Sequence, residues 1–107
     1  MPKLLKPLSK KDQAKLVTRF PQWKIAPDFS KATLTVVFTR HVDAIAFVAR
    51  LGIFAEVHQH HPKMMLTRAK IKLTVSTDRQ LTAPDLLIMK HVAELLTGGD
   101  KGATVAP

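Results

Sequence analysis

The chain of 107 residues contains no cysteine and no tyrosine, and only 6% of its residues are aromatic. Without cysteine, disulfides and thiolate chemistry are excluded. Neither a zinc-finger spacing nor an Arg/aromatic platform for stacking bases occurs, so we do not expect nucleic acid as a partner. No apolar run approaches the roughly 20 residues that span a bilayer, and the N-terminus lacks the apolar core of a secretory signal. We therefore expect a cytoplasmic protein without a membrane partner.

Acidic residues are also scarce, since eight Asp and Glu stand against 17 Lys and Arg, which gives a formal net charge of +9. Basic residues crowd positions 3–19, and Arg68, Lys70 and Lys72 crowd one predicted strand. Such a surface is either simply solvated or docks an acidic partner. Composition alone leaves both interpretations open.

The apolar pattern predicts one α+β domain. Nearly half of the residues are apolar (46%), enough for a single core. Two capping boxes, Ser9 to Asp12 and Thr82 to Asp85, open predicted helices that end near Phe20 and Leu96, and a broad apolar stripe predicts a long helix over 41–58. Strands are expected near Trp23 and over 31–39 and 70–77.

This order, α-β-β-α-β-α, predicts a small antiparallel sheet with helices packed on one face. We expect a flexible basic arm at 1–7, the domain at 8–97 and a flexible tail at 98–107. Gly52 interrupts the long helix, and a close helix–sheet contact would account for it. The core positions predicted for the first and last helices are Ala14, Leu16, Val17, Phe20, Leu87, Ile88, Val92 and Leu95.

Three of the five histidines, His58, His60 and His61, fall within four positions, directly before Pro62. Proline biases the residue before it away from helical backbone, so this corner should lie at a helix exit. Imidazoles placed there can bind metal, move protons or cap the helix. We expect no metal, because no further His, Cys or acidic cluster completes four ligands. Between residual catalysis and a structural corner, the incomplete constellation favours the corner.

With these residues in view, the chain resembles the pterin-4a-carbinolamine dehydratase family from about Leu8 to Leu96. The resemblance is carried by the Trp23 segment, the long helix, the run from Glu56 to Pro62, and the strand ending in Thr77. In that family one proton is delivered to the departing 4a-hydroxyl and one is removed from a ring nitrogen. The family's adjacent histidine pair maps onto His60 and His61.

The departures from the family pattern cluster in the pterin pocket. Asp78 stands where a third histidine is usual, and Arg79-Gln80 replace a loop that contains glycine. The usual aromatic beyond the proline is Met64, and the usual Asn and Tyr that follow are Leu66 and Arg68. The resemblance therefore implies a degenerate site, made of His60, His61, Asp78, Glu56 and Pro62. Candidate pocket or partner-binding residues are Met64, Arg68, Lys70 and Lys72.

A divergent branch of the family accompanies α-carboxysome genes and assists the assembly of Rubisco, and this chain resembles that branch. The resemblance implies a non-catalytic assembly factor or chaperone that binds Rubisco subunits, needs no cofactor and is associated with the carboxysome. Edge-to-edge pairing of a small sheet would give a homodimer or a higher homo-oligomer. The alternative is an active 4a-hydroxytetrahydrobiopterin dehydratase, a lyase that binds a pterin and uses His60, His61 and Asp78. A third, weaker interpretation is a nucleic-acid or transcription-associated binder, suggested only by the charge and by transcription-coactivator relatives of the family that the chain resembles.

Overall fold

The computed structural model describes residues 8–98 and 103–106. The predicted arm at 1–7 lies outside the described residues, as do 99–102 and 107 of the predicted tail. In chain order the elements are α1 (Lys10–Arg19), β1 (Lys24–Ile25), β2 (Ala32–Val37), α2 (His41–Val57), β3 (Lys63–Thr67), β4 (Lys70–Val75), α3 (Ala83–Gly98) and β5 (Thr104–Val105).

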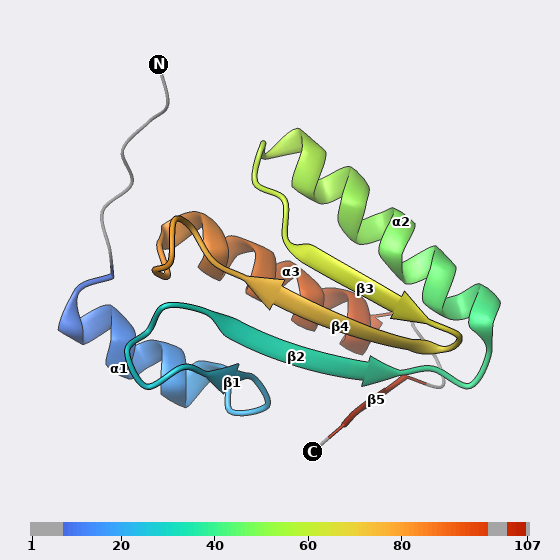
Figure 1. The fold of residues 1–107 in the computed structure, drawn as a ribbon, viewed down its shortest axis with the longest axis horizontal. Helices are drawn as coiled ribbons and strands as arrows, with labels where there is room; N and C mark the ends of the chain where they lie inside the picture. Colours follow the sequence, from blue (N-terminus) through green and yellow to red (C-terminus); the bar gives the residue numbers. More distant parts are fainter. Residues whose placement is uncertain (1–7, 99–102, 107) are drawn as a thin grey trace.

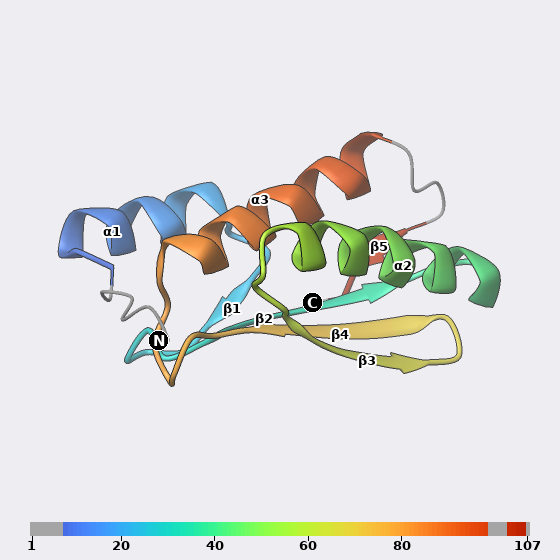
Figure 2. The same ribbon diagram turned by 90° about the horizontal axis from the view of Figure 1, so that it is seen from above.

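All strand pairs in the sheet are antiparallel. The order across the sheet is β1-β2-β4-β3, and β5 also pairs with β2. The three helices lie on one side of this sheet, as the edge-on view in Figure 2 shows. The predicted α+β architecture, an antiparallel sheet with helices on one face, is confirmed.

The core fills the space between the sheet and the helices. Alternate residues of the two central strands point into it, with Leu34 of β2 directly opposite Leu73 of β4. Phe47 and Leu51 of α2 and Ile88 of α3 are fully buried above them. This alternation along the strands is the pattern that the sequence predicted for a sheet with one covered face.

Two strands were not predicted. β3 has no inside–outside alternation of hydrophobic and polar residues, because Met64, Met65 and Leu66 are consecutive. β5 is only two residues long and lies within the segment predicted as a tail. Three predicted core residues are also exposed: Ala14, Val17 at 53% and Leu87 at 38%.

The helix starts follow local chemistry. Ser9 Oγ accepts a hydrogen bond from the backbone N–H of Asp12 at 3.2 Å, so the predicted N-cap of α1 is confirmed. In the first turn of α2, Arg40 donates to both carboxylate oxygens of Asp43 at 3.0 Å. These hydrogen bonds hold the pKa of Asp43 below its ordinary value. A carboxylate at this position also interacts favourably with the N-terminal end of the helix dipole.

Across the described ranges, no helix is both long and apolar enough to cross a membrane.

Candidate functional site

A helix-ending motif fixes the histidine corner at the end of α2. The backbone N–H of His60 donates to the carbonyl of Ala55 at 3.0 Å, and that of Gln59 donates to Glu56 at 3.2 Å. Gln59 has φ 52°, the left-handed conformation that this paired arrangement needs after a helix. The chain therefore turns sharply at Gln59, and His60, His61 and Pro62 lead into β3. Figure 1 shows the short connection from the end of α2 to the start of β3.

His60 points inward and binds a buried carboxylate. Its Nε2 lies 2.6 Å from Oδ1 of Asp85, whose side chain is fully buried, and the His60 side chain itself is 16% exposed. Since a carboxylate only accepts hydrogen bonds, Nε2 of His60 carries the proton in this contact. Because Nε2 already donates to Asp85, His60 has a structural role in this part of the fold.

Two threonines complete the hydrogen bonds of Asp85. Its Oδ2 accepts from the backbone N–H of Thr82 and from the hydroxyl of Thr77, both at 2.9 Å, and the Thr82 hydroxyl lies 3.2 Å away. The hydroxyls of Thr77 and Thr82 are themselves 2.9 Å apart. The bond from Thr82 N–H to Asp85 confirms one of the two hydrogen bonds of the predicted capping box at the start of α3. The network therefore ties α2, β4 and α3 together through one carboxylate.

His61 faces the opposite way, toward solvent. Its Nε2 lies 2.9 Å from Oε1 of Glu56, and both side chains are more than half exposed. This contact lets Glu56 orient the His61 ring. An exposed pair of this kind contributes little to stability. It does leave the His61 imidazole accessible to a ligand from solvent.

Asp78, at the family's third-histidine position, lies on a tight turn. Thr77 and Gln80 exchange both backbone hydrogen bonds, and between them Asp78 and Arg79 have φ values of 48° and 68°. Two consecutive residues with positive φ are typical of a type I′ turn. Asp78 is exposed, and no hydrogen bond or ion pair joins it to His60 or His61 within the described residues. The structure therefore places Asp78 as a turn residue.

The three clustered histidines have three different partners. The ring of His58 packs on Phe54 with centroids 4.3 Å apart, while His60 and His61 bind Asp85 and Glu56. Over residues 8–98 and 103–106, no group of three or more His, Cys, Asp or Glu side chains is placed to hold a metal ion. The donor set at this corner therefore does not fit a metal centre.

The remaining predicted site residues lie directly before β3, on β3 and β4, and in the turn between these strands. Pro62 and Met64 are half-buried, and Met64 packs against the hydrophobic core. The placement of Arg68 on a strand was wrong, because Arg68 occupies the β3–β4 turn with φ 57° and its carbonyl contacts Nδ1 of His41. A two-residue turn requires such a conformation, and the sequence gives no glycine there to signal it.

Lys70 and Lys72 lie on the sheet face that points away from the helices. The strand register places Lys72 between Thr35 and Met65 in one row across the sheet. The paired residues in the rows of Lys70 and Thr74, on either side of the Lys72 row, point to the same face of the sheet. We call this surface the open sheet face; its residues are Lys24, Thr33, Thr35, Val37, Lys63, Met65, Thr67, Lys70, Lys72, Thr74 and Thr104.

The composition of the open sheet face is strongly one-sided. It carries four lysines and five threonines, with no Asp or Glu at any of these positions. Lys24 and Lys72 also line a shallow hollow of about 540 Å³ with Lys31. Such a face attracts acidic surfaces over several ångströms and repels basic ones.

Asp85 is the site residue that sequence reasoning did not assign to the histidine corner. Its capping role was visible because Thr82 lies three positions away, whereas His60 lies 25 positions away. A contact over that distance depends on how the helices pack on the sheet. The available signal was a carboxylate in a capping box directly before the apolar run Leu86–Met89, which marks a candidate buried acceptor.

Comparisons with known proteins point to one family. The family model described as pterin 4 alpha carbinolamine dehydratase matches residues 6–95. A protein of Chlorobium luteolum, provisionally named a pterin-4-alpha-carbinolamine dehydratase, is 31% identical over 71 residues, which are 64% of this chain and 62% of that protein. A Thermomicrobium roseum protein with the same provisional name is 30% identical over 84 residues, covering 77% of this chain and 88% of the relative. The match thus spans less than two thirds of the Chlorobium protein's length.

The fold has a counterpart among solved structures. The crystal structure described as a transcriptional coactivator/pterin dehydratase from Brucella melitensis superposes with a TM-score of 0.77. The superposition covers 84% of this chain and 98% of that chain at 17% sequence identity. At this identity the likeness establishes the fold, and function has to be argued from the site.

Proposed function

This chain belongs to the pterin 4 alpha carbinolamine dehydratase family, and we propose that it is a non-catalytic member that assists the assembly of Rubisco in carboxysome-bearing bacteria. In this role it binds unassembled or misassembled Rubisco subunits transiently and limits their aggregation. It works in the cytoplasm near carboxysomes and needs no cofactor. Family membership accounts for the fold, and the geometry of the histidine corner argues against dehydratase activity.

The observation that carries the proposal is the position of Asp78. Dehydration of a carbinolamine needs proton carriers grouped around the substrate, with pKa values near the working pH. Asp78 lies exposed on a turn without a bond to either histidine, and His60 Nε2 is engaged by buried Asp85. Of the His60–His61 pair, only His61 has a solvent-exposed imidazole. The corner therefore supports a structural role better than a complete acid–base site.

The open sheet face supports the partner-binding half of the proposal. Four lysines without a neighbouring acid suit the transient capture of an acidic protein surface, and exposed Met65 adds an adaptable apolar contact. We assign Lys70 and Lys72 to this contact. They lie near the centre of the sheet, where a docked partner covers them most fully.

Self-association belongs to the same proposal. β3 pairs only with β4 in the described sheet, so its other edge is available, and Met65 and Leu66 on this strand are exposed. An available, partly apolar edge favours pairing with a second copy. We expect a homodimer or higher oligomer, and a monomer in sedimentation equilibrium at micromolar concentration would contradict this part.

The test is a refolding assay with denatured Rubisco large subunits diluted into buffer. We expect the protein to lower light scattering and raise the soluble fraction. The variant Lys70→Glu/Lys72→Glu should lose most of this protection, because it reverses charge at the centre of the open sheet face. Lys15→Glu/Lys90→Glu makes the same charge change elsewhere and should retain protection.

Two outcomes would contradict the proposal or its surface. Protection no better than that of a basic control protein of similar size would reject the assembly role. Loss of protection in the control variant, with the open-face variant intact, would reject the open sheet face as the docking surface.

The second candidate is an active dehydratase that binds a pterin, and the His61–Glu56 pair favours it. The Glu56 carboxylate fixes the orientation of the exposed His61 imidazole, which suits proton transfer to a departing hydroxyl. In this candidate His61 is the residue on which turnover depends. Turnover above the spontaneous rate that disappears in His61→Ala would support it.

A further inference from the structure

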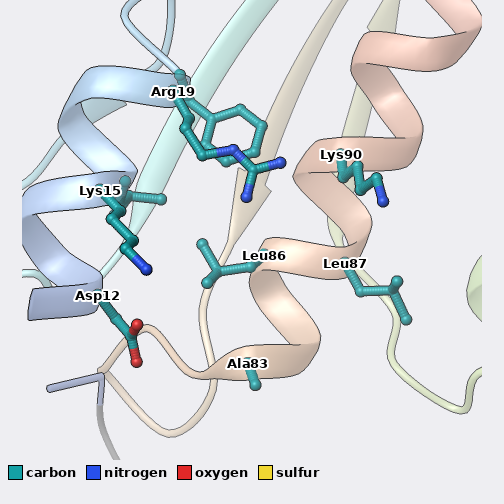
Figure 3. A pocket seen from close by; sticks show the side chains of 9 residues that line it. Asp12, Lys15, Arg19, Ala83, Leu86, Leu87 and Lys90 are labelled. Atoms are coloured by element: carbon teal, nitrogen blue, oxygen red, sulfur yellow. The ribbon is translucent and has the colours of Figure 1, made fainter.

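A groove between α1 and α3 lies apart from the histidine corner and from the open sheet face. It has a volume of about 320 Å³, and Figure 3 shows side chains of both helices around it. Arg19 and Lys15 of α1 and Leu86 of α3 extend into the space between the helices. We call it the α1–α3 groove; its lining residues are Asp12, Lys15, Leu16, Arg19, Phe20, Ala83, Leu86, Leu87 and Lys90.

The floor of the groove is apolar. Leu16 and Phe20 belong to the hydrophobic core, Leu86 is half-buried against it, and Leu87 is 38% exposed. Helical periodicity predicted Leu87 as a core residue, yet it lines this groove instead. A leucine left at the surface beside a groove is a position where a partner can bury further apolar area.

The rim of the groove is basic. Lys15, Arg19 and Lys90 supply three positive charges against the single negative charge of Asp12. No ion pair engages these three cations in the part of the chain that the structure describes. Arg19 instead rests over the ring of Phe20, 5.6 Å from its centroid, where a cation–π contact holds it at the edge of the floor.

The kind of occupant follows from where the charges lie. Sites for small ligands place a few polar groups inside a largely enclosed pocket. Here Lys15, Arg19, Lys90 and Asp12 are all exposed, and the buried lining residues are apolar. An apolar centre with a charged, accessible rim is the anatomy of a protein–protein interface. The groove therefore suits a protein segment better than an organic anion.

A second copy of this chain does not supply such a segment. Its eight acidic residues are scattered, and the closest pair in the sequence, Glu94 and Asp100, is six positions apart. Neighbouring carboxylates on one helix face require spacings of three or four. The occupant must come from a different protein with clustered acids.

We propose that the α1–α3 groove docks an acidic amphipathic helix of another protein. Apolar side chains of that helix pack on Leu86, Leu87 and Phe20, and its flanking carboxylates pair with Lys15, Arg19 and Lys90. The binding mode is that of a helix lying in a groove with anchors at i, i+3 and i+4. The proposal does not depend on the Rubisco role, since it concerns a different surface.

The test uses three synthetic peptides of about four helical turns, long enough to lie along the groove. The first carries leucine anchors at i, i+3, i+4 and i+7 with glutamates beside them; the second replaces glutamate by lysine; the third replaces leucine by serine. Fluorescence anisotropy with the full chain should show binding of the first peptide only. Binding should weaken with salt, because the rim pairs are exposed.

Variants locate the binding site. Lys15→Glu/Lys90→Glu should weaken binding of the acidic peptide by tenfold or more, whereas Lys70→Glu/Lys72→Glu, with the same net charge, should change it less than threefold. Lys15→Gln/Lys90→Gln gives an intermediate loss and guards against misfolding of the charge-reversed protein. Amide chemical-shift changes should concentrate in α1 and α3.

Several results would overturn the proposal. Equal weakening in both charge-reversed variants would show general attraction to a basic protein. Equal binding of the serine peptide would show that the apolar floor is not used. A dissociation constant weaker than about 1 mM for the acidic peptide, or shift changes centred on β4, would also reject the groove.

Discussion

Asp85 shows how a single side chain connects the histidine corner to the fold. It is completely buried, and its two oxygens contact His60, Thr77 and Thr82. A buried carboxylate is tolerated only when such donors surround it. His60 therefore has a structural reason to be where it is, independent of any chemistry on a pterin.

Replacing Asp85 by alanine should lower the free energy of unfolding by at least about 2 kcal/mol, because several buried donors lose their acceptor at once. Urea unfolding, compared at constant m-value, measures the change. Glu94→Ala is the matched control in the same helix. Its carboxylate is exposed and 3.6 Å from His91, so the change should stay within about 0.5 kcal/mol. Equal effects of the two substitutions would show that the Asp85 network contributes nothing beyond a surface pair.

Residue-level prediction succeeded where the chemistry is local. The caps at Ser9 and Thr82 were readable because donor and acceptor are three positions apart. The link from His60 to Asp85 was not readable, since it depends on packing between distant elements. Leu87 was misassigned for a related reason: periodicity shows that a helix has an apolar face, and packing decides how much of that face is covered.

At the scale of elements, α2 contains Gly52, a residue of low helix propensity that no packing contact explains. The sequence predicted that Gly52 marks a close contact between helix and sheet. A Cβ built at Gly52 meets no atom within 4 Å, so no such contact accounts for the glycine. The glycine then costs the helix its usual propensity penalty without a packing gain.

Gly52→Ala should therefore stabilise the protein by about 1 kcal/mol, the difference in helix propensity between the two residues. Thermal and urea unfolding both measure it. Ala49→Gly, at an exposed position one turn earlier, is the reverse control and should destabilise by a similar amount. A destabilising Gly52→Ala would show that a contact absent from the isolated chain, such as one with a second copy, requires the glycine.

The strands divide into those that sequence pattern can reveal and those that it cannot. β2 and β4 alternate between the core and the open sheet face, and both were predicted. β3 was missed because an edge strand with Met64 and Met65 side by side has no alternating signal. β5 consists of two residues held by β2, so its existence depends on its partner and not on its own composition.

At the scale of the whole molecule, charge is distributed by surface. The net charge of +9 was known from composition, but its division between the open sheet face and the α1–α3 groove appeared only with the strand register and helix packing. The histidine corner, by contrast, presents His61 with Glu56 and little free charge. The positive charge therefore gathers on the open sheet face and on the rim of the α1–α3 groove, and not at the histidine corner.

The most direct test of this account is a stopped-flow dehydration assay with freshly generated 4a-hydroxytetrahydropterin. The protein is run beside a family member that retains the third histidine, which verifies the substrate and the detection. We predict a rate indistinguishable from spontaneous dehydration, unchanged in His61→Ala, because Asp78 does not join the histidine pair. A rate well above the spontaneous one that is lost in His61→Ala would contradict the account and establish the corner as a working active site.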